Sequence, residues 1–286
     1  MAAERLPVQK ACRLLGVSES GYYAWKTRVP SNRQIRHAWL LEQIQAVHEA
    51  ARGVYGARRV WAELTMGLGL QVGRSQVELV MSRAGLRGIP GPRRSRQPRS
   101  NAPLPGDLVR RKFGRDHPNM LWVTDVTEHR TREGKIYCAV VLDTFSRKVV
   151  GWAIDSSPDA ALVTNALHMA IETRKPQQGT VIHSDHGTVF RSWVFTQRVQ
   201  AAGLLPSMGA IGSCYDNSMI ESFWGRMQTE LLDRQVWRTR LELANAIFEY
   251  LEMFHNRKRR HSRLGMRSPV EYEKLYEQAK MLRSGN

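Results

Sequence analysis

The chain has 286 residues, which is enough for one large domain or two to three small ones, each with its own buried core. Its 43 Lys and Arg residues against 26 Asp and Glu residues give a formal charge of +17, which argues against a small-molecule enzyme unless the partner is polyanionic. The three cysteines, Cys12, Cys138 and Cys214, are isolated in sequence, which excludes a disulfide framework and a CxxC zinc module.

The N-terminal segment, residues 1–50, is predicted to contain a helix-turn-helix-like unit. Val8–Gly16 has the pattern of a helix closed by a glycine, and Val17–Trp25 has that of a second helix with Ser18 as its N-cap. Helix, tight turn and helix is the outline of a helix-turn-helix, although an ordinary helical hairpin shares it. Both interpretations stay open at this point.

Two features predict a cytoplasmic protein without a membrane anchor. The chain has no run of 18 apolar residues, and charged residues interrupt the apolar pattern at its N-terminus, so neither a membrane span nor a signal peptide is expected. Isolated cysteines suit the reducing environment of the cytosol.

A second helical DNA-binding unit is predicted over residues 51–88. In Tyr55–Leu64 the apolar side chains share one helical face, and two arginines lie outside it. In Gly73–Ser82 the apolar side chains recur at i, i+3 and i+4, with Ser75 as the expected N-cap. Two small helical units among many basic residues indicate that this part of the chain binds DNA. The DNA contacts expected from this unit are Arg58, Arg59 and Arg74.

Residues 89–118 are predicted to form a basic, proline-rich linker. Five prolines lie between Ile89 and Pro105 and no apolar period is sustained, which predicts a semi-rigid segment extended over nucleic acid. Between Arg87 and Pro118 there are nine basic residues and two acidic ones. Such a block suits phosphate contacts, with a merely solvated surface or attachment to an anionic membrane as alternatives. The DNA contacts expected here are Arg93, Arg94 and Arg96.

The pattern changes over residues 119–254, where a mixed α/β core is predicted. Strand-like runs begin at Leu121, Lys135 and Lys148 and are separated by short turns, which predicts an antiparallel meander of three strands. The segments that follow are a helix over 159–173, a strand over 180–183, a helix over 192–202 and a strand over 204–207. This is the element order of the ribonuclease H-like fold, and it differs from the doubly wound order of a dinucleotide-binding fold.

The end of the chain is predicted to be helical and basic. Two helices are expected over 217–232 and 239–254. The C-terminal segment 255–286 opens with a block, His255–Arg267, that has six basic residues and no acidic one, and it continues with a capped helix start at Ser268. The DNA contacts expected in this block are Arg257, Lys258, Arg259 and Arg260.

Three carboxylates are predicted to lie at the edge of an apolar core, where a polar side chain can act as a ligand. Asp125 and Asp185 each follow a short apolar run, and Glu221 lies on the flank of the apolar stripe of the 217–232 helix. Each has a structural alternative, because aspartates at such places also cap turns and helices, and Ser218-x-x-Glu221 fits a capping box. Hard oxygen ligands on two strand ends and a helix flank suit a pair of Mg²⁺ or Mn²⁺ ions for phosphoryl transfer.

Other polar residues nearby fit structural roles better. His183 and His186 suggest a metal pair, but His-x-x-His at a strand end directs the two side chains to diverging faces, and no Cys or third His is near in sequence. Asp143 lies in a hairpin turn and Asp216 at the start of a helix, so both are interpreted as structural.

The residues around the three carboxylates resemble the sequence blocks of the DDE transposases in the retroviral integrase superfamily. The blocks are Trp122–Thr127, His183–Gly187 and Asp216–Phe223. Between Asp185 and Glu221 there are 35 residues, the interval typical of that group. In detail the chain resembles, over nearly its whole length, the second-reading-frame (OrfB) product of the bacterial insertion-sequence-three family. Tyr55–Val60 looks like that family's N-terminal helix-turn-helix-like region, and His255–Glu271 resembles its C-terminal signature.

The resemblance implies a DNA transposase with a ribonuclease H-like integrase core. Asp125, Asp185 and Glu221 would hold two Mg²⁺ ions, for which Mn²⁺ can substitute, and would catalyse cleavage and strand transfer at the element ends. The implied partners are double-stranded DNA, namely the terminal inverted repeats and the target, a second copy of the chain in a homo-oligomer, and an upstream-frame DNA-binding product, in some members as a fusion. The implied location is the bacterial nucleoid.

The chain departs from the family at three positions. Gln228 stands where the family often has a DNA-contacting lysine, although Arg226 could substitute for it, and both are kept as expected DNA contacts. Val189 and Phe190 replace a polar amide and a hydroxyl-bearing residue after the second block. Two alternatives therefore stay open: a DNA-binding regulator with an inactive core, and a structure-specific nuclease of the same fold.

Overall fold

A five-stranded sheet centred on β1 (Leu121–Thr131) is the frame of the protein, whose computed structural model describes residues 7–91, 114–208 and 218–284. The strand order is β3-β2-β1-β4-β5. β2 (Gly134–Asp143) pairs antiparallel with β1 and with β3 (Val149–Asp155), whereas β4 (Val181–Ser184) pairs parallel with β1 and with β5 (Leu205–Met208). The predicted meander and the mixed ribonuclease H-like sheet are confirmed.

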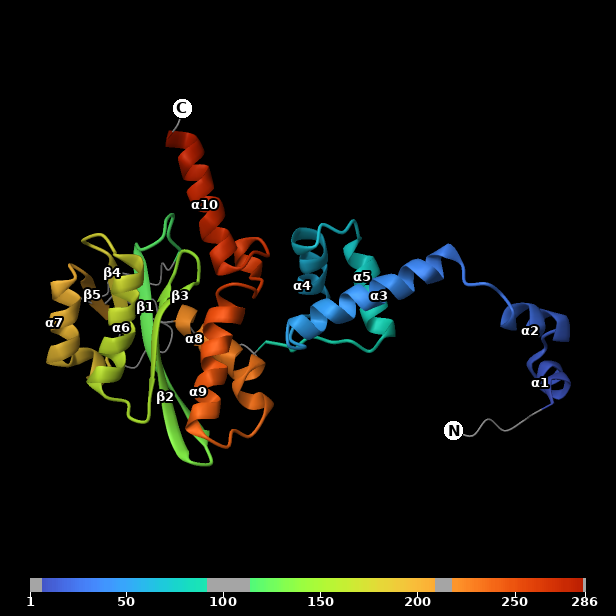
Figure 1. Cartoon of the computed structure of the whole chain (residues 1–286), viewed down its shortest axis with the longest axis horizontal. Helices are drawn as coiled ribbons and strands as arrows, with labels where there is room; N and C mark the ends of the chain where they lie inside the picture. The colour runs from blue at the N-terminus through green and yellow to red at the C-terminus, as the bar shows by residue number, and fades with distance from the viewer. Residues whose placement is uncertain (1–6, 92–113, 209–217, 285–286) are drawn as a thin grey trace, which may run out of the picture.

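Helices cover both faces of the sheet (Figure 1). One face packs against α6 (Ala160–Arg174) and α7 (Trp193–Ala201), and the other against α8 (Ser218–Glu230) and α9 (Arg240–Phe248). Side chains alternate between the faces along a strand, so β1 directs its even-numbered residues from Trp122 onward toward α6 and its odd-numbered ones toward α8. The two apolar cores of the protein lie on these two faces.

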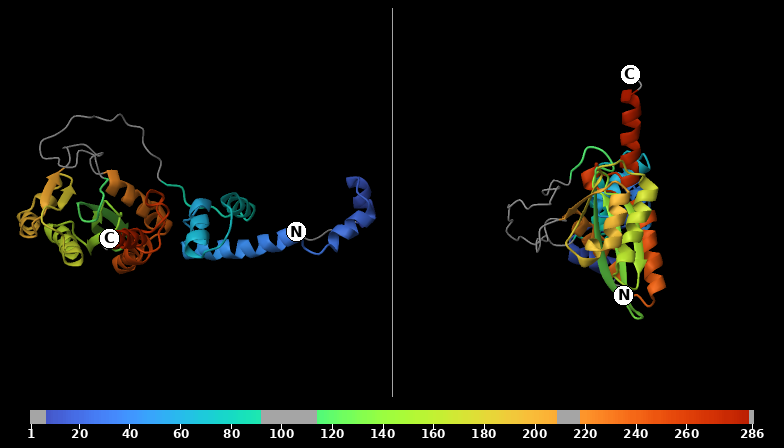
Figure 2. Two further views of the ribbon diagram at one scale, coloured as in Figure 1. Left: turned by 90° about the horizontal axis from the view of Figure 1, so that it is seen from above. Right: turned by 90° about the vertical axis from the view of Figure 1, so that its left-hand side faces the viewer.

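The first two helices begin and end where the local signals predict. α1 (Val8–Leu15) is closed by Gly16, which adopts a left-handed conformation with φ of 66°. The hydroxyl of Ser18 caps α2 (Glu19–Lys26) and accepts a hydrogen bond from the Gly21 amide at 3.0 Å. Both helices lie at the end of the protein farthest from the sheet (Figures 1 and 2).

The third helix, α3 (Asn32–Ala50), is absent from the sequence analysis although its start carries a clear signal. Ser31 and Gln34 form a capping box, in which each side chain accepts a hydrogen bond from the backbone amide of the other residue. Three residues of α3, Leu40, Ile44 and Val47, are buried against the helices that follow. Neither α3 nor any other helix within the described ranges is long and apolar enough to cross a membrane.

The second helical unit consists of α4 (Ala57–Ala62), the π-helical turn η1 (Glu63–Gly67) and α5 (Arg74–Arg83), packed against α3. The prediction of two helices here holds, but the prediction that Ser75 caps the second one is wrong. Gly73 is the N-cap of α5 and Ser75 lies inside the helix. Glycine is tolerated at an N-cap although it has no side-chain acceptor. Starting α5 after Gly73 instead of after Ser75 therefore costs little helix stability.

Of the C-terminal elements, α9 and the turn after it pack on the α8 face of the sheet, whereas the last helix projects away from it (Figures 1 and 2). α9 continues directly into the π-helical turn η4 (Glu249–His255), so the boundary expected between residues 254 and 255 falls inside that turn. α10 (Pro269–Ser284) begins with proline as expected, and the Ser268 amide donates to the Glu271 carboxylate at 2.7 Å. Short 3-10 turns occupy Thr188–Arg191 (η2), Leu232–Arg234 (η3) and Ser262–Leu264 (η5).

A buried ion pair ties the basic C-terminal block to α8. Arg259 donates from two guanidinium nitrogens to the Glu230 carboxylate at 2.6 and 2.7 Å, and the Tyr250 hydroxyl donates to the same carboxylate at 3.0 Å. Both charged side chains are only 3% exposed. The pKa of Glu230 is lowered because these partners outweigh the effect of burial. The expectation that Arg259 contacts DNA is therefore wrong.

The neighbouring Arg260 is also buried, and it joins the second helical unit to the core. Its guanidinium pairs with Glu63 of η1 at 2.5 Å, and its backbone amide donates to the Tyr55 hydroxyl at 2.8 Å. Tyr55 in turn donates to the carbonyl of Lys258 at 2.9 Å. The expected DNA contact at Arg260 is wrong for the same reason as at Arg259: the sequence shows a basic run, but the acidic partners lie far away in the chain.

Asp143 has the structural role expected of it. Its carboxylate is fully buried, accepts from the amides of Asn119 and Phe145 at 2.8 and 2.9 Å, and lies 3.2 Å from the guanidinium of Arg174. Arg174 also pairs with Glu273 of α10 at 2.9 Å. This network fixes the base of α10 on the edge of the sheet where β1 begins.

We expect Glu230→Gln to lower the free energy of unfolding by about 3 kcal/mol, because the variant leaves the Arg259 guanidinium buried without a counter-charge. Chemical denaturation followed by circular dichroism measures the effect. The control is Glu249→Gln, which breaks the partly exposed Arg52–Glu249 pair at 3.3 Å and should cost less than about 1 kcal/mol. Equal costs for the two variants would contradict the importance of the buried pair.

Candidate active site

The register of two parallel strands brings Asp125 beside Asp185. Leu121 of β1 pairs with Val181 of β4, and Val123 pairs with His183. The same offset continued by two residues sets Asp185, directly after β4, next to Asp125. Neighbouring strands lie about 4.8 Å apart and residues in register project to the same face, which here is the face covered by α8.

Asp125 is held by two hydrogen bonds, one on each carboxylate oxygen. Oδ1 accepts from the backbone amide of Val126 at 2.8 Å, and Oδ2 accepts from the indole Nε1 of Trp224 at 3.1 Å. Trp224 lies on α8, three residues after Glu221 and thus on nearly the same side of the helix. The sequence does not reveal this contact, because helical spacing alone assigns Trp224 to the apolar stripe of the helix.

The charges of Asp185 and Glu221 act on the carboxylate of Asp125. The pKa of Asp125 is raised to about 6, mainly because the group is largely buried and also because Asp185 and Glu221 add negative charge nearby, whereas the two hydrogen bonds act in the opposite direction. The pKa of Glu221 is raised by partial burial. The structure therefore brings the three predicted residues into one electrostatic environment.

Asp185 lies at an exposed turn whose backbone fixes its side chain. Oδ1 accepts from the amide of Gly187 at 2.8 Å, and the Ser184 hydroxyl donates to the Asp185 carbonyl at 3.0 Å. A Cβ atom at position 187 would lie 2.9 Å from Oδ1 of Asp185, so a larger residue there would require the carboxylate to shift from this position. Gly187 is a second supporting residue that the sequence analysis did not single out.

Glu221 lies in the first turn of α8, with its side chain partly exposed. Ser218 is itself helical, so it does not take the N-cap position that the capping-box alternative requires. The residues before Ser218, including Asp216, lie outside the described residues. The carboxylate of Glu221 is accessible to solvent and so to a ligand.

The donor set suits a hard divalent cation, although the carboxylates are not arranged as a closed metal site. Within the described ranges, no group of three or more His, Cys, Asp and Glu side chains is placed to hold a metal ion together. Asp125 and Glu221 nevertheless have raised pKa values, and a cation between such groups relieves the burial of charge and the mutual repulsion. Carboxylate oxygens are the ligands that Mg²⁺ prefers.

His183 of the second block is engaged inside the sheet. His183 is buried, and its Nδ1 lies 3.0 Å from the hydroxyl of Ser207 on the adjacent strand β5. The departures from the family pattern that follow lie in η2, where Phe190 is buried and its ring packs 5.5 Å from that of Phe195. The apolar residue at position 190 therefore contributes to the α6 face of the core.

The remaining expected DNA contacts divide by exposure. Arg58, Arg74, Arg257 and Lys258 are exposed, with Arg74 paired to Glu78 at 2.9 Å on the surface of α5.

Arg59 and Arg226 are half-buried instead. Arg59 lies over the Tyr55 ring and 3.8 Å from Glu230, and burial lowers its pKa to about 10. Arg226 packs against Gly91, and the neighbouring Gln228 donates to Asp233 at 2.5 Å. Arg93, Arg94 and Arg96 lie outside the described residues.

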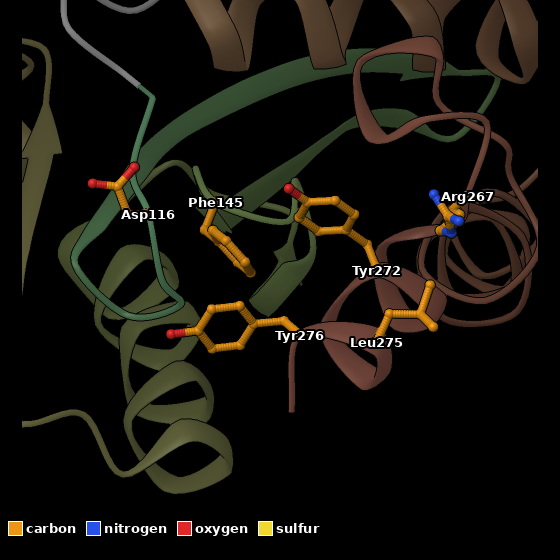
Figure 3. A pocket seen from close by; sticks show the side chains of 6 residues that line it. All are labelled: Asp116, Phe145, Arg267, Tyr272, Leu275 and Tyr276. Carbon is orange, nitrogen blue, oxygen red and sulfur yellow. The ribbon is translucent and has the colours of Figure 1, made fainter. Parts of the chain in front are cut away.

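Two cavities in the described part of the chain lie away from the carboxylates. One of about 400 Å³ lies at the base of α10, where the rings of Tyr272 and Tyr276 approach that of Phe145 (Figure 3). Another of about 610 Å³ lies between Arg52 and the connection from α8 to α9. None of the three carboxylates lines either cavity, and Asp185 and Glu221 are exposed, which suits a macromolecular substrate better than an enclosed small molecule.

Comparisons with protein families match three parts of the chain. Residues 115–214 and 202–269 match models described as an integrase core domain, and residues 34–95 match an HTH-like domain.

Several curated proteins are similar to this chain over most of their length. The "Transposase for insertion sequence element IS629" of Shigella sonnei is 37% identical, over 96% of this chain and 93% of the relative. The "Transposase InsF for insertion sequence IS3A" of Escherichia coli (strain K12) is 33% identical, over 93% of both chains. Among solved structures, the HTLV-2 integrase catalytic core domain in complex with magnesium superposes with a TM-score of 0.44 and 22% identity, over 55% of this chain and 97% of that one.

We expect Asp125→Asn to stabilise the metal-free protein by up to about 3 kcal/mol at pH 7.5, since a folded pKa of about 6 lies above the ordinary value of 3.8. The stability linked to the protonated group is fully present below the unfolded pKa and is lost as the pH rises through the folded pKa. Asparagine mimics the protonated form, so its advantage should fall to about half at pH 5. Urea denaturation at the two pH values measures it, and a destabilised variant at pH 7.5 would contradict the raised pKa.

Proposed function

The chain belongs to the transposases of bacterial insertion sequences, and we propose that it cleaves and joins DNA at the ends of such an element with Asp125, Asp185 and Glu221 as its catalytic carboxylates. The observation that carries this assignment is the parallel register of β1 and β4, which sets Asp125 beside Asp185 on the face that α8 covers. Glu221 reaches the same environment from α8, as its charge effect on Asp125 indicates.

We infer that these carboxylates hold two Mg²⁺ ions, for which Mn²⁺ can substitute. When bound, such ions activate a water or hydroxyl for attack and stabilise the charge on the leaving oxygen. The protein's own contribution is to hold Asp125 by hydrogen bonds on both oxygens and Asp185 by the amide of Gly187. Because the two carboxylates are already held in place before DNA binds, less reorganisation of the site is needed during the reaction.

The proposed reaction has two steps, both at phosphorus. In the first, water attacks the phosphodiester at the element end, and the bond from phosphorus to the 3′ oxygen breaks to leave a free 3′-OH. In the second, that hydroxyl attacks a phosphodiester of the target, so that one P–O bond forms as another breaks. Transesterification of this kind needs no covalent bond between protein and DNA.

The proposed partners follow from charge and exposure. Double-stranded DNA, as terminal inverted repeat and as target, suits a chain with a net charge of +17. Arg58 and Arg74 on the helical unit and Arg257 and Lys258 after η4 are exposed and would contact phosphates. Joining two ends of an element calls for more than one subunit, so we propose a homo-oligomer, with an upstream-frame DNA-binding product as a possible further partner or fusion.

Two other functions share this site and one assay separates them. A regulator with an inactive core gains support from Gln228, which is engaged with Asp233, and a nuclease of the same fold would use the same carboxylates without joining. Incubating the protein with precut end DNA, target DNA and Mg²⁺ distinguishes the cases. Joined product supports the transposase, cleavage alone supports the nuclease, and binding alone supports the regulator.

We expect Glu221→Gln to reduce strand transfer at least about a thousandfold while the melting temperature stays nearly unchanged, because the partly exposed side chain contributes an ionised oxygen ligand and little packing. The assay with precut ends measures joining, and calorimetry measures stability. Glu172→Gln, an exposed acid on α6 across the sheet, is the control and should retain full activity. Full activity of the Glu221 variant would remove this residue from the site.

We expect Arg58→Ala and Lys258→Ala each to weaken binding to end DNA and to random duplex alike, and to reduce the slope of log K against log salt by about 1, because each removes one phosphate contact. Fluorescence anisotropy at several salt concentrations measures both effects. An Arg→Ala change at position 259 should instead lower protein stability. An unchanged salt slope in both surface variants would place the DNA on another face.

A further inference from the structure

The indole of Trp224 links α8 to β1 by a hydrogen bond to Asp125. Its Nε1 donates a hydrogen bond to Oδ2 of Asp125 at 3.1 Å, and Oδ1 of the same carboxylate accepts one from the backbone amide of Val126. Each carboxylate oxygen has two acceptor positions, so one on each oxygen stays open. A donor at this place therefore orients the carboxylate without using up its capacity to bind a cation.

We propose that Trp224 is a positioning residue that fixes the carboxylate plane of Asp125, an inference that rests on the proposed function of that aspartate. The terminal torsion of an aspartate is broad, so the backbone amide of Val126 alone leaves the second oxygen weakly constrained. The indole nitrogen carries a hydrogen and no lone pair to offer a cation, so it cannot compete as a ligand. Its hydrogen bond to a charged acceptor is of the stronger kind.

The orientation of the indole is set by the core beneath it. The ring of Trp224 packs 4.9 Å from that of Phe223, and Phe223 packs edge-on against His255 at 5.0 Å. His255 is buried and its Nε2 lies 2.8 Å from the carbonyl of Arg147, so the ring is fixed in turn. A rigid ring delivers its N–H to one point, which is what a supporting residue of a catalytic carboxylate must do.

A purely structural role predicts a different outcome from the same substitution. Phenylalanine at position 224 keeps most of the aromatic packing and removes only the donor. If Trp224 merely fills space, Trp224→Phe should change stability slightly and leave the metal dependence of joining unaltered. If it positions Asp125, the concentration of Mg²⁺ required should change even though the protein remains folded.

We expect Trp224→Phe to raise the Mg²⁺ concentration for half-maximal strand transfer by about 10- to 100-fold, the usual effect of removing a residue that supports a metal ligand. The matched control is Trp152→Phe, which removes an indole hydrogen bond to Glu252 at 2.9 Å outside the site and should leave the requirement unchanged. Calorimetric titration of Mg²⁺ into each variant bound to precut DNA tests the same shift without turnover.

A second measurement reports the hydrogen bond directly and needs no metal. The chain has eight tryptophans, and the indole ¹⁵N–¹H signal missing from Trp224→Phe identifies that of Trp224. In Asp125→Asn this signal should move upfield, because a neutral amide replaces the charged acceptor, and the other indole signals should stay in place. Asp125→Ala, which removes the acceptor, should move it further.

The outcomes separate the two levels of inference. Normal joining by Asp125→Asn would overturn the proposed function itself. An inactive Asp125→Asn together with a Trp224→Phe variant of normal Mg²⁺ requirement, or with an unmoved indole signal, would overturn the role of Trp224 alone.

Discussion

The parallel pairing of β1 with β4 is the constraint on which the rest of the site depends. It places two aspartates that are 60 residues apart in the chain at the same height in the sheet. A slip of one residue would send Asp185 to the opposite face, because side chains alternate along a strand. The buried, fully apolar start of β1 resists such a slip, since Leu121 and Val123 belong to one core and Trp122 to the other.

Helix α8 connects this site to the rest of the protein, because it carries one acidic residue on each side of its buried apolar stripe. Ile220, Phe223 and Met227 face the core, with Glu221 on one side of the stripe and Glu230 on the other. Glu230 pairs with Arg259 and lies near Arg59 of the second helical unit. The helix that carries a proposed catalytic group is therefore anchored, at its far end, by the elements that join the helical unit to the core.

Sequence patterns predict the sheet and the three carboxylates because both depend on local periodicity and spacing. The strand runs, the capped helices and the interval from Asp185 to Glu221 are all readable within short windows. The roles of Arg259 and Arg260 are not, because a basic residue looks the same whether it meets phosphate or a distant glutamate. Trp224 is missed for a related reason: helical spacing assigns its ring to the core, whereas its one polar atom reaches a strand 99 positions away in the chain.

The burial of Asp125 explains why so exposed a site still needs a rigid frame. An ionised carboxylate that is largely buried beside two others costs folding free energy, and its raised pKa expresses that cost. The cost is tolerated only if the surrounding contacts leave the aspartate no alternative position. The β1–β4 register, the Val126 amide and the Trp224 indole together supply that restriction. The protein therefore loses some folding free energy at Asp125, and in return a negative charge is held where it can bind a cation beside a phosphate.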